Sequence, residues 1–600
     1  MKRLIVALLF LFAPCSVWAA AISTAQDGEW SSTSTWTGGV VPGNGDTVTI
    51  ATGHDVTVSD NRTVGTAGAT GTEAIQVQGT GTLTVSAGST LTVKGGLNQQ
   101  RGTTITISGT LVLDAASGVT YEWKALNTGS GNAIMRISGT SSTDRALVTI
   151  GTGGGIGRFQ TNGGSFFYTD INFQNGIVKG LGTSTVTAMD NYIAVSGQHN
   201  IQTNMAWVEC GEVIVTAAHG PSGYIWNNVD FRNPTDSGFL SISASVAKTT
   251  GTRTINNLTN YKSTGSTTLS LNAFDTTING MYLYNTIFSV STYARSMNAS
   301  NILYLADAAG VTFNIGLRQA GNMITDIVSL LRYPNQHHLQ DSATLNAAGV
   351  LNTISGLICD GDDYYSIDAG DCVSVFGPLK ISNSINLNKG GTLASITGAN
   401  AITDLENNTV YGSYHTAVGE TAGSASQIRL FRNNISASLG SGLKQISAFV
   451  SQTDFTLSHN AYYDMTTSTN IDYLGQNTYL GEATFNPWWS SGAYGDPNKG
   501  SDDIYVNPMF YDTTRTVRKF GGWGTVAATA EEMVTINGVD KDGVLTTVTT
   551  KRVQHIKDYI RKGFTPQNLT LKTAGYGGTY IGAVEPQLFG NGAALLLMGH

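Results

Sequence analysis

The sequence predicts an all-β fold, a single-stranded right-handed parallel β-helix with an N-terminal β cap and a short C-terminal helical cap. The main observation is an Asn that recurs at the end of successive short β-rich segments, at Asn383, Asn408, Asn434 and Asn460, with spacings of 25, 26 and 26 residues. A constant period of this length is typical of solenoids. The segments leave no room for a long helix. We therefore expect stacked turns whose Asn side chains hydrogen-bond along the solenoid axis.

The composition agrees with this fold. Gly accounts for 72 of 600 residues and charged residues for only 12%, about half the usual share of charge. The formal net charge is −8. Since phosphate binding requires clustered cations, this composition argues against nucleic acid as a partner.

The N-terminus has the pattern of an export signal, residues 1–19. Lys2 and Arg3 precede an apolar run, and Val17-Trp18-Ala19 provides small residues for cleavage. No later segment approaches the roughly 20 apolar residues of a membrane span. We expect a protein that is secreted, held at the cell surface or periplasmic.

Residues 20–73 are predicted to form the N-terminal cap module. Alternation at Val48, Ile50, Val56 and Val58 indicates strands. A solenoid needs a cap because its open edge would otherwise pair with another chain. We assign Trp30 and Trp36 to the core of this cap.

The string Trp36-Thr-Gly-Gly-Val-Val-Pro-Gly43, followed by Gly45-Asp-Thr-Val-Thr-Ile50, carries a resemblance. It resembles the N-terminal module of many bacterial surface β-helix proteins and a glycine-rich extracellular domain of eukaryotic cell-surface proteins that is named for its eight glycines. The resemblance implies a secreted bacterial right-handed parallel β-helix protein with the pectate-lyase-like fold.

Residues 74–500 are predicted to form the solenoid, and residues 501–600 its closing strands and helical cap. Asp502–Asp512 is similar to the closing strand of many parallel β-helix proteins. Val553, Ile556 and Ile560 form one apolar face of a helix that ends at Gly563. The tail from Tyr559 to Ala583 resembles that of uncharacterised bacterial and phage-associated β-helix proteins. We expect the helix to cover the last turn, with its charges in solvent.

The densest cluster of charge lies between Cys359 and Cys372, which are close enough in sequence for a local disulfide. This loop carries five carboxylates: Asp360, Asp362, Asp363, Asp368 and Asp371. Crowded carboxylates repel one another unless a cation or a shared proton relieves them. Three interpretations stay open: a solvated turn, a Ca²⁺ site, or catalysis on a glycosidic bond through Asp362 and Asp363.

Two further observations bear on catalysis. Gly370-Asp371-Cys372 is similar to the aspartates followed by Cys in polygalacturonases, but the Gly-His-Gly and Arg-x-Lys elements that should follow are absent, so their catalytic residues are not carried over. Arg332, with His337 and His338 nearby, is either part of a surface loop or a participant in β-elimination from a uronate, helped by Ca²⁺.

Aromatic residues gather between positions 462 and 494. Aromatic rings with polar tips suit sugar binding, and the candidates are Tyr462, Tyr463, Trp488 and Trp489. Packing over the last turns is the alternative interpretation.

We therefore predict a polysaccharide-binding or glycan-binding surface protein with an adhesin-like recognition face. A polysaccharide lyase or glycoside hydrolase acting through residues 332–372 is one alternative, and a stalk component that binds protein is another. Whether the chain is an enzyme stays open, and so does its oligomeric state, homotrimers being common among fibre-like β-helices.

Overall fold

The chain folds as an all-β parallel β-solenoid of about 10 turns, as the Asn repeat predicted, with 59% strand and 8% helix. The structure is a computed structural model and describes residues 19–66, 73–114, 116–117, 119–150, 156–161, 169–180, 200–208, 212–216, 224–232, 239–243, 252–261, 267–271, 275–290, 297–306, 312–315, 321–331, 339–341, 351–361, 371–375, 377–387, 392–396, 402–412, 415–419, 427–437, 446–447, 456–463, 470–473, 476–479, 502–517 and 549–588. The predicted signal peptide thus lies outside the described residues, apart from Ala19.

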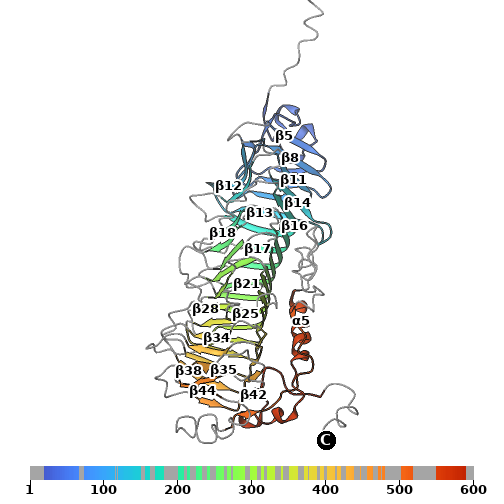
Figure 1. The fold of residues 1–600 in the computed structure, drawn as a ribbon. Helices are drawn as coiled ribbons and strands as arrows, with labels where there is room; N and C mark the ends of the chain where they lie inside the picture. Colours follow the sequence, from blue (N-terminus) through green and yellow to red (C-terminus); the bar gives the residue numbers. More distant parts are fainter. Residues whose placement is uncertain are drawn as a thin grey trace, which may run out of the picture. The chain divides into compact units, whose positions relative to one another are not determined.

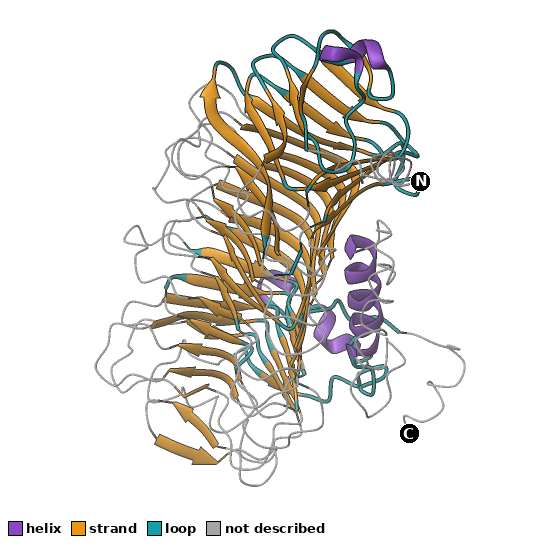
Figure 2. Ribbon diagram, turned by 90° about the horizontal axis from the view of Figure 1, so that it is seen from above, coloured by secondary structure: helices purple, strands orange, loops and turns teal. Residues whose placement is uncertain are grey.

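Two compact units divide the chain, Met1–Asp190 and Asn191–His600, and each is described by itself. In both, strands from successive turns stack in parallel rows (Figure 1, Figure 2).

The first unit contains three rows of parallel strands. The first row is β1 (Ala21–Ser23), β3 (Thr47–Ile50), β6 (Glu73–Val77), β9 (Gly96–Arg101), β12 (Thr120–Gly129) and β15 (Ile156–Thr161). The second is β2 (Gly28–Glu29), β4 (Asp55–Val58), β7 (Thr82–Val85), β10 (Thr104–Ile107), β13 (Ala133–Ser138) and β16 (Thr169–Gly180). The third is β5 (Arg62–Gly65), β8 (Thr90–Lys94), β11 (Thr110–Leu113) and β14 (Ala146–Ile150), which pairs with the end of β16.

The two tryptophans expected in the cap are buried in the first turn, next to the short 3₁₀ helices η1 (Thr33–Thr35) and η2 (Thr37–Gly39). Their rings meet edge to face at 5.0 Å. Trp36 Nε1 donates to the carbonyl of Trp30, and Trp30 Nε1 donates to the carbonyl of Pro42. Both indoles therefore serve the core of this turn.

The second unit begins with long strands that pair in parallel, β17 (Asn200–Val208), β19 (Tyr224–Arg232), β21 (Thr252–Tyr261), β23 (Asp275–Tyr284), β25 (Met297–Ala306) and β27 (Met323–Leu331). After β27 each long strand is replaced by two short ones. One row is β29 (Asn352–Ser355), β32 (Leu379–Ser382), β35 (Ile402–Glu406), β38 (Gln427–Arg432) and β41 (Thr456–Ser458). The other is β30 (Ile358–Asp360), β33 (Ile385–Asn386), β36 (Thr409–Tyr411), β39 (Ile435–Ala437), β42 (Ala461–Tyr463) and the closing strand β45 (Ile504–Tyr505).

A ten-stranded parallel sheet forms another face of this unit. Its members are β18 (Glu212–Thr216), β20 (Phe239–Ser243), β22 (Thr267–Leu271), β24 (Thr286–Val290), β26 (Phe313–Ile315), β28 (Leu339–Asp341), β31 (Val373–Val375), β34 (Thr392–Ile396), β37 (His415–Gly419) and β40 (Ile446–Ser447). A separate antiparallel pair consists of β43 (Asn470–Tyr473) and β44 (Gln476–Tyr479).

The recurring Asn marks a one-residue bend in the left-handed conformation. In successive turns this position has φ between 52° and 86° and is occupied by Asn204, Asn228, Asn257, Gly280, Asn301, Asp326, Gly356, Asn383, Asn407, Asn433 and His459. Asn and Gly tolerate this conformation far better than other residues. Amides at these bends also join turns, as in the 2.9 Å bonds from Asn228 Nδ2 to Asn204 Oδ1 and from Asn257 Nδ2 to Asn228 Oδ1. We call these bend residues the outer column, and Asn383 is one of them. Asn408 belongs to the inner column, which consists of the residue that follows each bend.

The predicted Asn stacking along the axis is confirmed most clearly at that inner position. Asn408, Asn434 and Asn460 are fully buried. Asn408 Nδ2 donates to Asn434 Oδ1 at 3.1 Å, and Asn434 Nδ2 donates to Asn460 Oδ1 at 3.2 Å. Each Oδ1 also accepts the backbone N–H of the previous Asn. Asp503 Oδ1 ends the series by accepting both donors of Asn460.

An apolar stripe runs along the outside of this unit, on the strand face that lies away from the solenoid interior. Tyr282, Leu303, Val328, Ile358 and Ile385 are aligned there by strand register. The helix α5 (Thr549–Gly563) covers this stripe with Val553, Ile556 and Ile560, and lies beside β23, β25 and β27 (Figure 1). The predicted helix is therefore confirmed, but it packs on the flank of the middle turns and not over the last one, because these outward side chains need an apolar partner.

One charge of the helix is buried as well, which corrects the expectation that its charges lie in solvent. Lys557 Nζ pairs with the Asp326 carboxylate at a left-handed bend. Burial lowers the pKa of Lys557 to about 8. Buried ion pairs add little net stability, whereas each buried aliphatic side chain contributes about 1.5–3 kcal/mol. The apolar face therefore holds the helix, and the ion pair fixes its position. Among the described residues, no helix is both long enough and apolar enough to cross a membrane.

The inner Asn column leads to a prediction. Asn434→Ala leaves the donors of Asn408 and one carbonyl unsatisfied in the interior, so we expect a loss of about 2–4 kcal/mol, seen as a lower urea midpoint by circular dichroism. The matched control is Asn407→Gly at the outer bend, which keeps the left-handed backbone and should cost less than about 1 kcal/mol. Equal losses in the two variants would contradict a special role for the inner column.

Candidate binding surface

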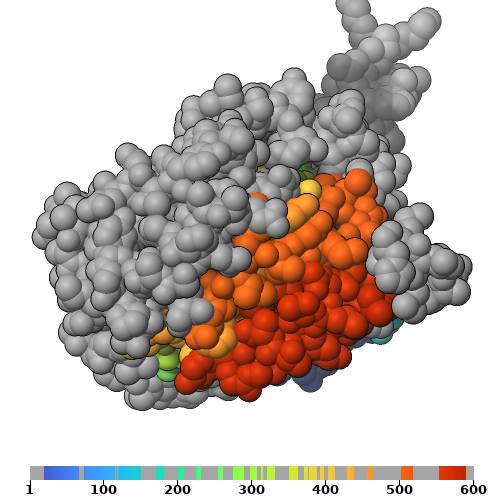
Figure 3. Space-filling model, turned by 60° about the horizontal axis from the view of Figure 1, so that its bottom comes forward, coloured from blue at the N-terminus to red at the C-terminus, as the bar shows by residue number. Residues whose placement is uncertain are grey.

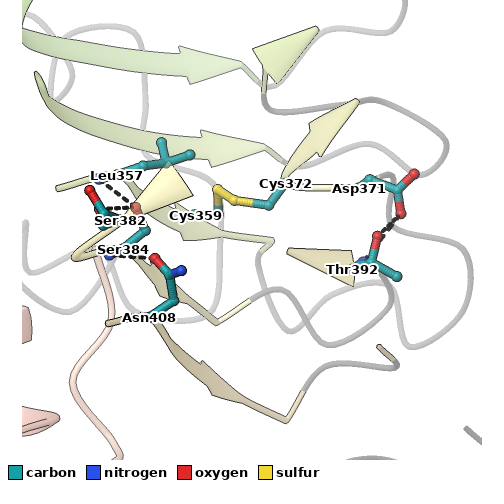
Figure 4. Close-up of a disulfide and its surroundings, with 8 residues drawn as sticks. All are labelled: Leu357, Cys359, Asp371, Cys372, Ser382, Ser384, Thr392 and Asn408. Atoms are coloured by element: carbon teal, nitrogen blue, oxygen red, sulfur yellow. Dashed lines mark hydrogen bonds between the residues drawn. A yellow bond between two sulfur atoms is a disulfide. The ribbon is translucent and has the colours of Figure 1, made fainter. Parts of the chain in front are cut away.

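The predicted disulfide is present and lies inside the solenoid. Cys359 and Cys372 are bonded with a Cα–Cα distance of 5.9 Å, and both are fully buried (Figure 4). Cys359 belongs to β30 and Cys372 immediately precedes β31. The bridge thus closes the base of the acidic loop from within.

The two described carboxylates of this loop are held by other parts of the chain. Asp360 Oδ2 accepts the Val517 N–H at 2.7 Å, and the residue is buried. Asp371 Oδ1 accepts the backbone N–H of Thr392 at 3.2 Å and also its hydroxyl (Figure 4). Asp360 therefore anchors the C-terminal segment through one carboxylate oxygen, and its assignment as a candidate calcium ligand stays a prediction.

The remaining candidates for metal binding and catalysis lie outside the described residues: Asp362, Asp363, Asp368 and Arg332, with His337 and His338. Within the described ranges, no three His, Cys, Asp or Glu side chains are grouped closely enough to hold a metal ion.

Of the four aromatic candidates, Tyr462 is a correction. It is only 1% exposed, and its hydroxyl donates to Asp503 Oδ2 at 3.0 Å. Its ring points into the interior because its strand position faces inward, so it cannot stack on a sugar. Tyr463 is half-buried with its ring 6.3 Å from that of Tyr505. Trp488 and Trp489 lie outside the described residues.

Asp503 is the buried acid at the end of the Asn column. Burial raises its pKa to about 7, although hydrogen bonds from Asn460 and Tyr462 favour the ionised form. Asp503 is the last described member of this column, and its Oδ1 accepts hydrogen bonds from the backbone N–H and the Nδ2 of Asn460. The carbonyl oxygen of a carboxyl group can accept in either protonation state, whereas an amide in its place would add two N–H donors that need partners of their own.

A charged network that the sequence did not predict lies on the outside of β32, β35 and β38. Glu406 accepts hydrogen bonds from Lys380 and from Arg432. Burial alone would raise the pKa of Glu406, but these two cations outweigh it and hold the pKa below its usual range. Arg429 binds Asp404 through two parallel bonds of 3.0 and 2.6 Å. Five charged residues thus meet on three neighbouring strands of a charge-poor chain.

Tyr576 lies against this network. The Arg432 guanidinium is 4.3 Å from its ring centroid, and the His459 ring meets it edge-on at 5.5 Å. His459 Nε2 is in turn 3.8 Å from Asp502 Oδ2. Tyr576 is nevertheless 55% exposed. It therefore presents an aromatic side chain to solvent beside the Arg432 guanidinium and the His459 imidazole.

The position of Tyr576 is fixed by hydrogen bonds to the solenoid bend at Asn433. Its N–H donates to Asn433 Oδ1 at 2.9 Å, and Asn433 Nδ2 reaches Thr579 Oγ1. Gly577 and Gly578 both have positive φ, within the short η5 (Tyr576–Gly578). A bend of the solenoid thus positions the loop that carries the ring. In Figure 3 the red C-terminal segment lies against the orange strands of the last turns.

An exposed aromatic ring beside a guanidinium group is a combination that can bind a sugar. Aromatic side chains stack on the apolar face of a ring, while planar guanidinium and carboxylate groups hydrogen-bond to hydroxyls. The only sequence signal was an isolated Tyr before two glycines, more than 100 residues from Arg432.

Comparisons with protein-family models, with curated proteins and with solved structures found no match.

Asp503 leads to a prediction of pH dependence. Because its folded pKa is raised from 3.8 to about 7, its contribution to stability is full below pH 4 and is lost as the pH rises to 7. The unfolding free energy should fall over this interval, by up to roughly 4 kcal/mol. Asp503→Asn should flatten this dependence in denaturation curves at pH 4.5 and 7.5. Asp502→Asn, at the exposed neighbour, should keep the full slope, and a wild-type-like slope in Asp503→Asn would refute the assignment.

Proposed function

We propose that this chain is a secreted or cell-surface protein that binds a polysaccharide or cell-surface glycan, and that Tyr576 provides an aromatic platform for it. The observation that carries this proposal is the exposure of Tyr576 between Arg432 and His459. Lys380, Glu406 and Arg429 supply donors and acceptors on the adjacent strands.

The outer faces of the preceding turns support an extended ligand. Uncharged amides and hydroxyls are aligned there, including the pair Asn227 and Asn256 and the pair Asn279 and Ser300. Asn256 Nδ2 donates to Asn227 Oδ1 at 2.8 Å. Strands repeat at about 4.8 Å, so a linear polymer would meet an uncharged polar side chain at each of these turns. Such a surface fits a polymer with many hydroxyl groups better than a compact ligand.

We favour binding because the fold brings Tyr576, Arg432 and His459 together on one exposed surface. The lyase or hydrolase alternative depends on Asp362, Asp363 and Arg332, and Asp360 is already engaged by Val517. No observation favours the stalk alternative.

A polysaccharide panel tests the proposal. Purified protein is titrated with each polymer by calorimetry, and released reducing ends are followed in parallel. For a bound polymer, Tyr576→Ala should weaken affinity by more than about fivefold, the threshold of a significant contact residue. Tyr511→Ala is the matched control, since Tyr511 is also exposed and also lies beside a cation.

Equal losses in the two variants would reject Tyr576 as the platform. Release of reducing ends would support the enzyme alternative in place of simple binding, and an empty panel would reject the glycan as partner.

A further inference from the structure

The helix α5 meets the solenoid through one amine and one carboxyl group that are far apart in the sequence. Lys557 Nζ contacts Asp326 Oδ1 across a separation of 231 residues. The Lys557 side chain is only 4% exposed. Other lysines that pair with carboxylates among the described residues are Lys124, Lys380 and Lys572, whose side chains are 27%, 35% and 51% exposed. Of these four amines, that of Lys557 is the one removed from water.

Two neighbouring bends of the solenoid provide the space for this contact. Asp326 occupies a position of the outer column that is Asn in most other turns, and the same position in the next turn is Gly356. A Cβ at Gly356 would lie 3.0 Å from Lys557 Nζ and 3.1 Å from Asp326 Oδ1. A side chain at Gly356 would therefore displace the amine. The glycine leaves room for the amine and the carboxyl group to meet.

Burial also changes the chemical state of the amine. Removal from water disfavours the ammonium form of Lys557 and lowers its pKa, and the nearby positive charge of Arg561 acts in the same direction, whereas Asp558 opposes them. Transfer of one proton from the Lys557 ammonium to the Asp326 carboxylate removes both charges from the interior and gives a neutral amine beside a neutral carboxylic acid. A lysine amine that is desolvated in this way is a nucleophile.

We propose that Lys557 and Asp326 condense into an isopeptide bond that fastens α5 covalently to the solenoid. The neutral amine attacks Asp326 Cγ, a C–N bond forms, and the C–O bond to the carboxyl hydroxyl breaks. One proton passes from the nitrogen to that hydroxyl, which leaves as water. The step consumes only the two side chains and needs no oxidant, reductant or further reactant.

The folded structure favours this condensation. Two groups held in contact react as if each were present at an effective concentration of about 10⁵–10⁸ M when they are well oriented. The product is a neutral amide, which replaces two charges that are costly to bury. The small exposure of Lys557 limits the access of water that would reverse the reaction. In the unfolded chain the two groups are 231 residues apart and have none of these advantages.

The bond gives α5 a role that its apolar face alone does not provide. The helix covers the outer apolar stripe with Val553, Ile556 and Ile560, and an uncovered stripe of this kind is an aggregation liability. A cross-link between distant positions restricts the unfolded chain, as a disulfide does. The isopeptide bond thus keeps the stripe covered, and this role does not depend on the proposed glycan site at Tyr576.

Peptide mapping of the purified full chain by mass spectrometry tests the inference. The protein is denatured, reduced and digested with trypsin, which does not cleave after a lysine whose amine is acylated. We expect Gln319–Arg332, which contains Asp326, and Val553–Arg561, which contains Lys557, as one joined species. Its mass should equal the sum of the two peptides less one water. The intact reduced chain should likewise be lighter by one water than its sequence, counted from the N-terminus that sequencing identifies.

Two variants serve as matched controls for the chemistry. Lys557→Arg keeps the positive charge beside Asp326, but a guanidinium stays protonated and is not a nucleophile, so the joined species should be lost. Lys562→Arg makes the same change elsewhere on α5 and should retain the joined species. The inference is overturned if the wild-type digest contains the two peptides only as separate species, which would leave an ion pair, or if the joined species persists in Lys557→Arg.

Discussion

The left-handed bend between successive strands is the constraint on which the second unit depends. It restricts one position per turn to Asn, Gly, Asp or His, and it places the next residue in the interior. In the earlier turns that inner residue is apolar, as at Met281, Ile302 and Ile327, and one long strand runs through the bend. In the later turns it is Ser384, Asn408, Asn434 or Asn460, whose side chains bond to backbone groups. The strand divides in two from Leu357 onward, because a side-chain oxygen of the next turn, Ser384 Oγ or an Asn Oδ1, accepts the inner residue's N–H in place of a strand carbonyl.

The fold was predictable from the sequence because an Asn recurs at the bend of each turn. The outer apolar stripe was not predicted, because its residues lie in the same repeating segments as the core residues. Runs such as Met281-Tyr-Leu-Tyr284 lack the alternation of a half-exposed strand, and continuous apolar runs mark strands that are buried on both faces. The pattern alone does not say what covers the outer face. The covering helix is separated from its partner strands by more than 200 residues, and no local signal joins Ile560 to Leu303 or Lys557 to Asp326. Its amphipathic period was therefore recognised but its location was not.

The candidate site was predicted less well than the fold for a related reason. Residue type identified the disulfide, since two cysteines 13 residues apart can reach one another. Residue type misassigned Tyr462 and missed the partner of Asp360, because both belong to strands whose alternation decides which way a side chain points. Asp360 faces Val517 and Tyr462 faces Asp503. The charged network escaped notice because Lys380, Glu406 and Arg432 are spread over three repeats and meet only when strands one turn apart are placed side by side.

A repeat of this kind uses its own polar groups to hold itself together, and this explains where the candidate functional features lie. Asn and Ser side chains at the bends bond to neighbouring turns, and the inner amides bond to buried carbonyls, so these groups hold the turns together. The segment after Asp502 does not follow the repeat and has other structural roles. It covers the stripe with α5, it presents Tyr576 over Arg432, and it exposes Met509 and Leu588. The helix depends on Asp326 of the solenoid and the Tyr576 loop depends on Asn433. Asp360 anchors the chain at Val517. The repeat thus acts as the scaffold, and the sequence that departs from it at the C-terminal end covers one flank of it and presents Tyr576 to solvent.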